Sequence, residues 1–362
     1  MGRQKGSLEI VAMNPTFGFY RGKTVLVTGH SGFKGTWLCH WLRLLGARVI
    51  GFSLPLSQEN RFFAESHPEL VSLHGDVRDQ AALDRVIREH QPQLVFHLAA
   101  QALVGRSYED PVGNFATNVL GTVHLLEAVR RNPAVKACVN ITSDKCYHNH
   151  EWPWGYREID PLGGKDPYSA SKACAELVTQ AYRASFFAEG TGIASARAGN
   201  VIGGGDWSAG RIIPDIVRAL EAGQPVLLRR PAATRPWQHV LEPLHGYLIL
   251  ARRLFEDPAA FAGPWNFGPL QPTSPTVREL TEGFLKHWGS GSLEIAAEAR
   301  TFAEAHQLRL DSSKAHALLH WQPLLSMTER LEWTVAWYRA YRDNRSGAVH
   351  NDQIAAYMER CR

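Results

Sequence analysis

A tyrosine and a lysine four residues apart are the first candidates for chemistry. They stand in the segment Tyr168-Ser-Ala-Ser-Lys172, at the start of a predicted helix. Residues four apart share one face of a helix, so the phenol and the ammonium would project into the same space. A nearby ammonium stabilises a phenolate and lowers the pKa of the tyrosine, which makes Tyr168 a usable general base near neutral pH. The spacing also arises by chance, so the interpretation depends on the rest of the chain.

A second candidate is the segment Thr142-Ser-Asp-Lys-Cys-Tyr147, which follows a predicted buried strand. Ligands of open α/β sheets bind beyond the carboxyl ends of the strands, so these side chains should line a pocket. We expect the Ser143 hydroxyl to bond a substrate hydroxyl, with Asp144 and Lys145 as an adjacent acid and base. The plainer alternative is a solvated Asp-Lys pair on a loop.

A glycine-rich turn, Gly29-His-Ser-Gly32-Phe-Lys-Gly35, lies between the first predicted strand and the first predicted helix. Glycines at these positions allow the tight turn, the approach of backbone to a pyrophosphate and the close packing of helix on strand. The helix N-terminus would offer free N–H groups and a positive dipole to the phosphates. A glycine triplet alone is a weak signal, and a turn without a ligand is its plainer interpretation. At the first strand-to-helix turn of a long series, it predicts a dinucleotide site.

The elements that must position these residues alternate regularly. Short β-branched or apolar runs, typical of strands buried on both faces, recur between stretches whose apolar residues have helical spacing. The predicted strands are 24–28, 48–52, 71–74, 94–98, 137–142 and 192–196, and the predicted helices are 33–45, 79–90, 114–131 and 167–189. This alternation predicts parallel βαβ units and an α/β fold with a Rossmann-type doubly wound parallel sheet.

The pattern changes after Asn200, where glycine and proline become frequent and the segments are shorter. A chain of 362 residues is long enough for about two structural units. We expect an N-terminal extension over 1–20, a Rossmann domain over 21–199 to which 237–265 returns, a smaller substrate-binding region over 200–236 and 266–345, and a C-terminal tail over 346–362.

Composition and charge argue against several other classes of protein. Apolar residues make up 44% of the chain, too many for disorder. The 39 basic and 35 acidic residues leave a net charge of +4 without basic clusters, so we expect no nucleic-acid partner. Five widely spaced cysteines without a CxxC pair argue against a disulfide framework and a metal site, and favour a reducing compartment. No segment has the length of a signal-peptide core or a membrane span, so we expect a cytoplasmic enzyme.

Together and in this order, the glycine turn, the strand-end segment and the Tyr–Lys pair resemble the extended short-chain dehydrogenase/reductase superfamily over nearly all of residues 20–340. Within it, the chain is similar to the CDP-glucose 4,6-dehydratase family. That family has a lysine inside the glycine turn, and Ser-Asp-Lys-Cys-Tyr where dTDP-glucose dehydratases have an Asp-Glu pair. Further matching segments are Trp154-Gly-Tyr-Arg-Glu158, Asp166-Pro-Tyr-Ser169, Ala198–Trp207, Arg235-Pro-Trp-Gln-His-Val240 and the region of Leu310, Asp311, Lys314 and Trp321.

The resemblance implies a role for each matching residue. The cofactor would be NAD, and its pyrophosphate would bind to Gly29, Gly32, Phe33, Lys34 and Gly35. Its adenine would contact Asp76 and Val77, and its nicotinamide-side ribose would contact Leu98, Ala99 and Ala100. Asn118 would lie near the active site. Tyr168 would be the base, and Lys172 its partner and a ribose contact. The sugar nucleotide would be faced by Asn200, Arg211, Arg235 and His239, although His239 is equally compatible with a packed polar residue.

The reaction that the resemblance implies converts CDP-D-glucose to CDP-4-dehydro-6-deoxy-D-glucose by oxidation at C4, loss of water across C5 and C6, and return of the hydride to C6. Asp144 would be the acid, and Lys145 stands where relatives have a glutamate base. A lysine serves as a base only if its pKa is depressed. Another NAD-dependent epimerase or oxidoreductase of the superfamily is the alternative, because only the elimination needs the Asp144–Lys145 pair.

Coenzyme choice and assembly depend on the resemblance alone. No carboxylate follows the second strand, where Gly51-Phe-Ser-Leu54 stands, so the usual ribose anchor that favours NAD is missing. The resemblance implies a homodimer or a tetramer, with the helices at 114–131 and 167–189 at the interface. It also implies a place in dideoxysugar and O-antigen biosynthesis.

Overall fold

A seven-stranded parallel sheet forms the centre of the molecule. The computed structural model describes residues 14–66, 69–269, 275–296, 307–343 and 346–361. The strands of the sheet are β1 (Thr24–Thr28), β2 (Arg48–Ser53), β3 (Val71–His74), β4 (Leu94–His97), β5 (Ala137–Ile141), β6 (Gly192–Ala198) and β10 (Gly263–Phe267). Their order, β10-β6-β5-β4-β1-β2-β3, reverses between β1 and β4, and all neighbours pair in parallel. The predicted Rossmann-type doubly wound fold is confirmed.

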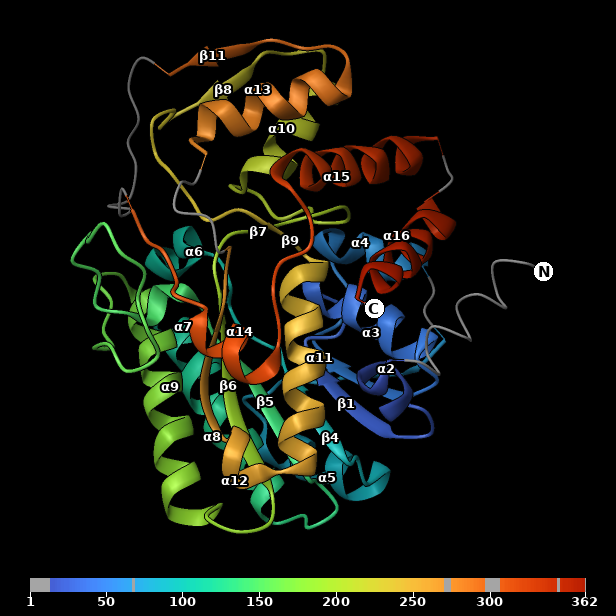
Figure 1. Ribbon diagram of the computed structural model, residues 1–362, viewed down its shortest axis with the longest axis vertical. Helices are drawn as coiled ribbons and strands as arrows, with labels where there is room; N and C mark the ends of the chain where they lie inside the picture. The colour runs from blue at the N-terminus through green and yellow to red at the C-terminus, as the bar shows by residue number, and fades with distance from the viewer. Residues whose placement is uncertain (1–13, 67–68, 270–274, 297–306, 344–345, 362) are drawn as a thin grey trace.

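Helices cover both faces of the sheet (Figure 1). One face carries α5 (Gln80–His90), α8 (Gly121–Arg130) and α9 (Pro167–Phe186), and the other carries α3 (Phe33–Leu44) and α11 (Leu241–Glu256). Successive residues of β1 alternate between the two cores: Leu26 packs on the side of α5 and α8, and Val25 and Val27 pack on the side of α3. Asp166 caps α9 by accepting a hydrogen bond from the backbone of Ser169, so the helix begins just before Tyr168.

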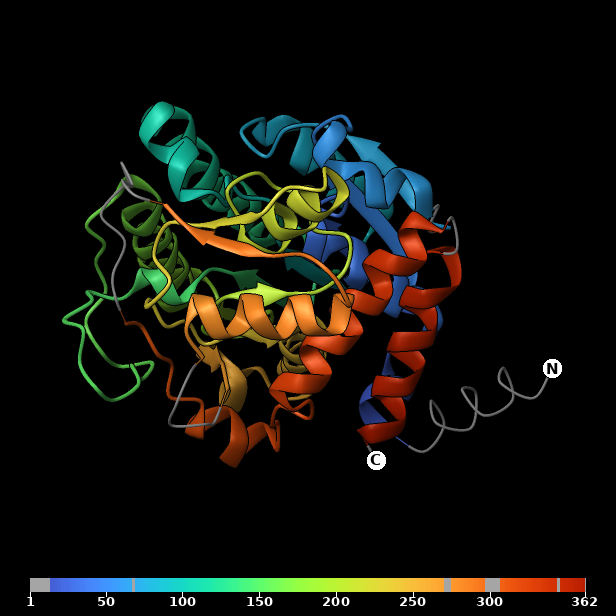
Figure 2. The ribbon, with the colours of Figure 1, turned by 90° about the horizontal axis from the view of Figure 1, so that it is seen from above.

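Residues beyond β6 form a smaller lobe at one end of the sheet (Figures 1 and 2). Two short parallel pairs belong to it, β7 (Val201–Ile202) with β9 (Gln238–His239), and β8 (Val226–Leu228) with β11 (Leu293–Ile295). Its helices are α10 (Ile212–Glu221), α13 (Val277–Trp288) and α15 (Met327–Arg342). Between these segments, α11 and β10 return the chain to the sheet.

Both ends of the described chain fold onto the sheet domain, where we expected an extension and a tail. Helix α2 (Pro15–Phe19) buries Phe17 completely, with its ring 6.0 Å from that of Trp41. Helix α16 (Ser346–Arg360) packs against α3 and buries Tyr357. The expectation was wrong because α2 is too short to show a helical period, and because the partners of both helices are distant in the sequence. Residues 1–13 and 362 lie outside the described residues.

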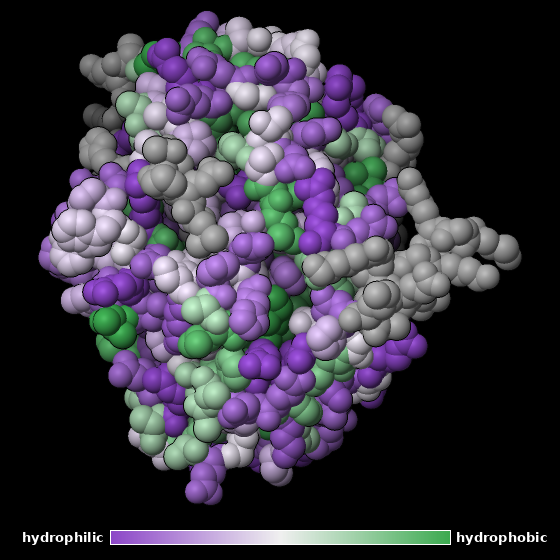
Figure 3. Space-filling view, in the orientation of Figure 1, coloured by the Kyte–Doolittle hydropathy of each residue, from purple (hydrophilic) through white to green (hydrophobic). Residues whose placement is uncertain are grey.

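The helix expected over 114–131 is divided into α7 (Pro111–Phe115), the π-helical turn η2 (Ala116–Leu120) and α8. Such turns occur mostly inside α-helices and are frequent at functional sites. The other short elements are η1 (Gln58–Asn60), α4 (Arg61–Ser66), α6 (Val104–Glu109), η3 (Asp144–Cys146), α12 (Pro258–Phe261) and α14 (Ser313–Leu319). On the face seen in Figure 3, apolar side chains gather around α11 and α12 among polar ones. Within the part of the chain described, no helix is long and apolar enough to cross a membrane.

Candidate active site

A cleft of about 1680 Å³ opens between the sheet domain and the smaller lobe, at the carboxyl ends of β1, β4, β5 and β6. Its walls include the glycine turn after β1, the segment after β5 and the first turns of α9. Ligands of doubly wound sheets bind on this side, where the strand order reverses. Apart from Asn118 and His239, every residue that we expected in the site lines this cleft.

The glycine turn has the shape that a dinucleotide pyrophosphate needs. Gly29 has a φ of +69°, and a Cβ there would lie 2.7 Å from the backbone nitrogen of Ala99. A Cβ on Gly35 would lie 2.1 Å from the carbonyl oxygen of Gly29, so both positions require glycine. Gly32 caps α3 without a side-chain hydrogen bond, and a Cβ there would meet only one atom within 4 Å. The N-terminus of α3 is therefore open to an anion, and the turn fits a dinucleotide.

The residues expected around the adenine and the ribose follow β3 and β4. Asp76 is paired with Arg78 at 2.6 Å, and this hydrogen bond holds the pKa of Asp76 below its usual range. Asp76 is therefore an ionised acceptor at the edge of the cleft. Where many dinucleotide sites have an acid after β2, the hydroxyl of Ser53 bonds that of Ser31 at 2.8 Å.

Ser143, Asp144 and Tyr168 meet at the inner end of the cleft. The Ser143 hydroxyl donates to Asp144 Oδ1 at 3.0 Å, and the Ser143 and Tyr168 hydroxyls are also hydrogen-bonded. Asp144 is 4% exposed, and burial raises the pKa of its carboxyl group although Lys145 lowers it. A raised pKa makes Asp144 a better candidate for a general acid than an exposed aspartate.

Burial shifts the pKa values of Tyr168 and Lys172 in opposite directions, raising that of Tyr168 and lowering that of Lys172. Burial raises the pKa of Tyr168 to about 12, against the lowering effects of Ser143 and Arg211. Lys172 Nζ donates to the carbonyl of Ile141 at 3.4 Å, and burial lowers its pKa to about 8. In this geometry, desolvation of the phenolate outweighs the nearby cations, and the role of Lys172 in making Tyr168 a base near neutral pH stays a prediction.

Lys34 also reaches the inner end of the cleft. Its Nζ donates to the Tyr247 hydroxyl of α11 at 3.4 Å and lies 5.8 Å from the centre of that ring. Burial lowers the pKa of Lys34 to about 7, and the charges of Arg211 and Lys172 act in the same direction. The ammonium of Lys34 therefore lies beside the catalytic candidates, and its contact with the pyrophosphate stays a prediction.

The smaller lobe supplies arginines to the outer part of the cleft. Arg211 donates to Asp206 Oδ2 at 3.1 Å, and this ion pair raises the pKa of Arg211. Asn200 and Arg235 line the same cleft. A cluster of guanidinium groups and an amide suits a diphosphate, because guanidinium binds phosphate oxygens in a bidentate manner. The expected contacts of these three residues with a sugar nucleotide stay predictions.

His239 lies outside the cleft, and its assignment to the sugar nucleotide is wrong. It is completely buried on β9, with its ring 6.1 Å from Trp37 and 5.8 Å from Trp333. Burial lowers its pKa to about 3, so the imidazole is neutral. His239 is a core residue that packs between α3 and α15, two helices that are far apart in the sequence.

Asn118 is also buried and touches no part of the cleft surface. Its Oδ1 accepts from the backbone N–H of Gln101 at 2.8 Å, and its Nδ2 donates to Ser171 Oγ at 2.9 Å. The π-turn η2 thus ties the loop after β4 to α9 at Ser171, the residue before Lys172. Asn118 therefore supports the wall of the cleft, and its contact with the cofactor stays a prediction.

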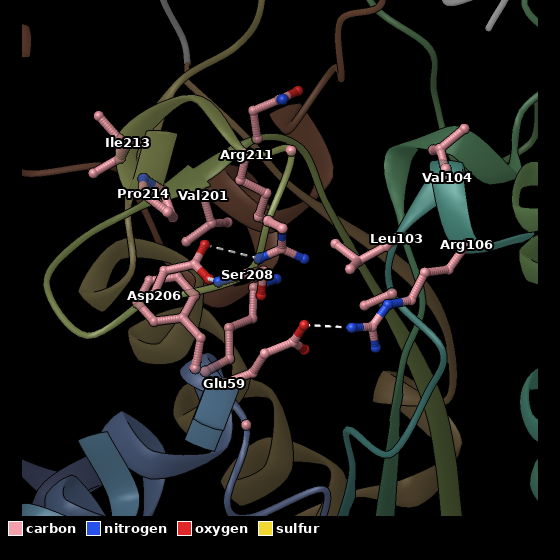
Figure 4. A pocket seen from close by; sticks show the side chains of 18 of the residues that line it. Glu59, Leu103, Val104, Arg106, Val201, Asp206, Ser208, Arg211, Ile213 and Pro214 are labelled. Carbon is pink, nitrogen blue, oxygen red and sulfur yellow. Dashed lines mark hydrogen bonds and ion pairs between the residues drawn. The ribbon is translucent and has the colours of Figure 1, made fainter. Parts of the chain in front are cut away.

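Sequence reasoning missed one of two ion pairs that face each other across the cleft (Figure 4). Glu59 of η1 pairs with Arg106 of α6, opposite the Asp206–Arg211 pair of the smaller lobe. Asp206 lies in the matching segment Ala198–Trp207 and Arg211 was expected in the site, whereas Glu59 and Arg106 belong to no motif that we recognised. Glu59 and Arg106 follow β2 and β4, so the rule that ligands bind beyond the carboxyl ends of parallel strands is the signal that could have found them.

Comparison with known protein families gives a match over residues 25–261 to the NAD dependent epimerase/dehydratase family. The chain belongs to this family, and NAD is its cofactor. Among individual proteins, a CDP-glucose 4,6-dehydratase from Salmonella typhimurium is 49% identical over 331 residues, which are 89% of this chain and 92% of that protein.

Solved structures agree with this family. A dTDP-glucose 4,6-dehydratase from Streptomyces venezuelae, solved with NAD bound, has a TM-score of 0.76 and 28% identity, and covers 88% of this chain and 98% of its own. A UDP-glucose 4-epimerase from Thermus thermophilus, also with NAD, has a TM-score of 0.75 and 26% identity, and covers 87% of this chain and 99% of its own.

Proposed function

We propose that this chain is a CDP-glucose 4,6-dehydratase, which converts CDP-D-glucose to CDP-4-dehydro-6-deoxy-D-glucose and water. The observation that carries the proposal is a buried acid, Asp144, linked through Ser143 to Tyr168. An epimerase or a simple oxidoreductase needs only the Tyr168–Lys172 pair, whereas an elimination also needs an acid beside the leaving hydroxyl. The choice of CDP-glucose is supported by the 49% identical dehydratase from Salmonella typhimurium.

The first part of the reaction removes the proton of the C4 hydroxyl. The oxygen of Tyr168 accepts it, helped by the Ser143 hydroxyl and the Arg211 guanidinium, which both lower the pKa of Tyr168. The chemistry that bound NAD would supply is the uptake of the hydride from C4 and its return to C6. Lys172, on the second turn of α9, would hold the ribose. The backbone at Gly32 would hold the pyrophosphate.

The second part is the loss of water from C5 and C6. A carbonyl at C4 acidifies the C5 hydrogen, because the carbanion is stabilised as an enolate. Asp144 donates its proton to the C6 hydroxyl, which leaves as water. We assign removal of the C5 proton to Lys145, the adjacent residue of η3, whose side chain lines the cleft.

One incubation tests this proposal. The purified protein is mixed separately with CDP-, dTDP-, UDP- and GDP-glucose, and products are identified by mass. We expect a product lighter by one water from CDP-glucose. With CDP-glucose carrying deuterium at C4, the label should appear at C6, and exchange with solvent should occur at C5 only. Stoichiometric accumulation of NADH, or loss of the C4 label to solvent, would instead identify an oxidoreductase or an epimerase.

We also propose a homodimer that pairs through η2 and α9. Leu120, Leu177 and Phe186 on these helices are 52%, 53% and 54% exposed. Large apolar side chains gathered on neighbouring exposed helices favour an interface. Sedimentation should give twice the chain mass of 40.3 kDa at micromolar concentration, and a single-chain species would contradict the dimer. A cytoplasmic site and a role in deoxysugar biosynthesis for O-antigen belong to the same proposal, and the five free cysteines fit a reducing compartment.

A further inference from the structure

A buried ion pair lies beneath the segment that carries Ser143, Asp144 and Lys145. Arg197 of β6 donates to Glu176 Oε2 of α9 at 2.7 Å, and the two side chains are 2% and 3% exposed. Burying two charges costs desolvation energy that their attraction only partly offsets, so apolar residues of similar volume often stabilise a fold as well. Stability alone therefore does not account for this pair.

The pair holds the catalytic segment at both of its ends. Thr142, the residue before Ser143, donates its hydroxyl to Glu176 Oε1. Arg197 donates from its second nitrogen to the hydroxyl of Tyr147, the residue after Cys146, at 2.7 Å. Residues 143–146, which include the acid and the serine, are thus fixed through their two neighbours by a single ion pair.

Neighbouring strands anchor the pair in turn. The Ser195 hydroxyl of β6 donates to Glu176 Oε2 at 2.6 Å, and the Tyr147 hydroxyl donates to Asn266 Oδ1 of β10 at 2.9 Å. The guanidinium of Arg197 also lies 4.8 Å from the centre of the Tyr147 ring. A buried network with most members bonded is rigid, so movement of the catalytic segment would require these contacts to break.

Glu176 has a second neighbour of catalytic interest, Lys172, which lies one helical turn earlier on α9. Side chains four apart on a helix have Cβ atoms about 5–6 Å apart. Burial lowers the pKa of Lys172, and the charge of Glu176 is the largest effect that raises it. The other titratable groups around Lys172 are Tyr168, Cys146 of η3, His97 of β4 and Lys34 of α3. Burial keeps the Cys146 thiol protonated, which leaves Glu176 as the anion among them.

We propose that the Glu176–Arg197 pair is a positioning element of the active site, which fixes residues 143–146 against α9 and places the carboxylate of Glu176 one helical turn from Lys172. The two residues act through their neighbours and need not touch substrate. The inference rests on the proposed function for its kinetic test only, because the charge state of Lys172 is measurable without any substrate.

Glu176→Gln tests the proposal, because it keeps the size of the side chain and one acceptor oxygen but removes the charge and the second acceptor. We expect kcat to fall about ten-fold or more, with KM for CDP-glucose within about three-fold. The alkaline limb of the pH profile should move down by about one unit, since a nearby opposite charge shifts a pKa by about 1–3 units. NMR of ¹³C-labelled lysine side chains, assigned with Lys172→Met, should show the pKa of Lys172 falling by the same amount.

Two further variants separate positioning from folding. Glu176→Asp retains the charge and should return the alkaline limb and the Lys172 pKa toward the wild-type values. If the single Gln variant does not fold, Glu176→Gln combined with Arg197→Met removes the unpaired guanidinium and should fold, with the shift in the Lys172 pKa retained.

Glu242→Gln is the matched control, because Glu242 is a completely buried carboxylate on α11 that accepts from the backbone of Leu324 and Leu325. We expect its melting temperature to change but its pH profile to match the wild type. An unmoved Lys172 pKa in Glu176→Gln, or an equal shift in the control, overturns the positioning role. A wild-type protein without activity on CDP-glucose would overturn the proposed function and leave the NMR result to decide the positioning role.

Discussion

Replacing Asp144 by Asn removes the proposed acid with little change of shape. The amide oxygen still accepts the hydrogen bond that Ser143 donates to Oδ1 at 3.0 Å, and Ser143 still accepts from the backbone of Lys145 at 3.2 Å. The contact between the Ser143 and Tyr168 hydroxyls involves neither oxygen of Asp144. Substrate binding and the base are therefore retained, and only the transferable proton is lost.

The expected loss in rate follows from this role. A positioned general acid contributes about 10²–10⁴-fold, which corresponds to about 3–5 kcal/mol of barrier. The loss should fall on kcat and on kcat/KM equally, because the proton is needed only in the transition state. Steady-state kinetics with CDP-glucose measures both. A kcat within a few-fold of the wild type, or a loss that falls on KM alone, would refute the assignment of Asp144 as the acid.

The same substitution should not destabilise the fold near neutral pH. Burial raises the folded-state pKa of Asp144 above its unfolded value, which is about 3.9, so the native state binds more protons than the unfolded state in the intervening range. Stability of the wild type therefore decreases as pH rises through that range. An asparagine does not ionise and lacks this decrease. Thermal melts at pH 7 should give Asp144→Asn a melting temperature equal to or above that of the wild type, and a clearly lower value would contradict the buried-acid geometry.

Three other substitutions test the site and its support. Tyr168→Phe keeps the ring and the helix but removes the proton acceptor, and should lower kcat by about 10²–10⁴-fold; activity within a few-fold of the wild type would exclude Tyr168 as the base. Gly35→Ala places a Cβ 2.1 Å from the Gly29 carbonyl oxygen, so NAD binding measured by calorimetry should be lost, whereas unchanged affinity would show that the turn can adjust. Phe17→Ala leaves a cavity against Trp41 and should lower the free energy of unfolding by about 3–5 kcal/mol in denaturant melts; a change below about 1 kcal/mol would mean that α2 is not part of the folded core.

Local patterns were sufficient to predict the sheet domain. The strand at Thr24–Thr28 was predicted with its observed bounds, and Gly192–Ala198 was predicted two residues short, because buried parallel strands are compact apolar runs bounded by turns. The glycine turn was also predicted from a local pattern, since its three glycines lie within seven residues of sequence. These features depend on neighbours within a few residues.

The features that we failed to predict depend on distant partners. We expected His239 to contact substrate because its segment is polar. The structure instead packs it between Trp37 and Trp333, which lie about 200 and about 90 residues away in the chain. The π-helical turn η2 within the 114–131 helix was not predicted, because it accompanies hydrogen bonds of Asn118 to the loop after β4. Burial, and with it the pKa of Tyr168, is likewise a property of the assembled cleft and not of the Tyr–Lys spacing.

The proton affinities of the acid and the base depend on each other, because Asp144 and Tyr168 share one hydrogen-bonded serine. Ionised Asp144 raises the pKa of Tyr168, whereas Arg211 lowers it. Burial raises the pKa of Asp144, and protonation of Asp144 removes the negative charge that would oppose formation of the phenolate. The protonation state that lets Asp144 donate to the C6 hydroxyl is therefore also the state in which Tyr168 most readily accepts the C4 proton. Ionisation of Asp144 at higher pH should impair both steps together, so the alkaline loss of C4 oxidation and of water elimination should occur at the same pH in single-turnover experiments.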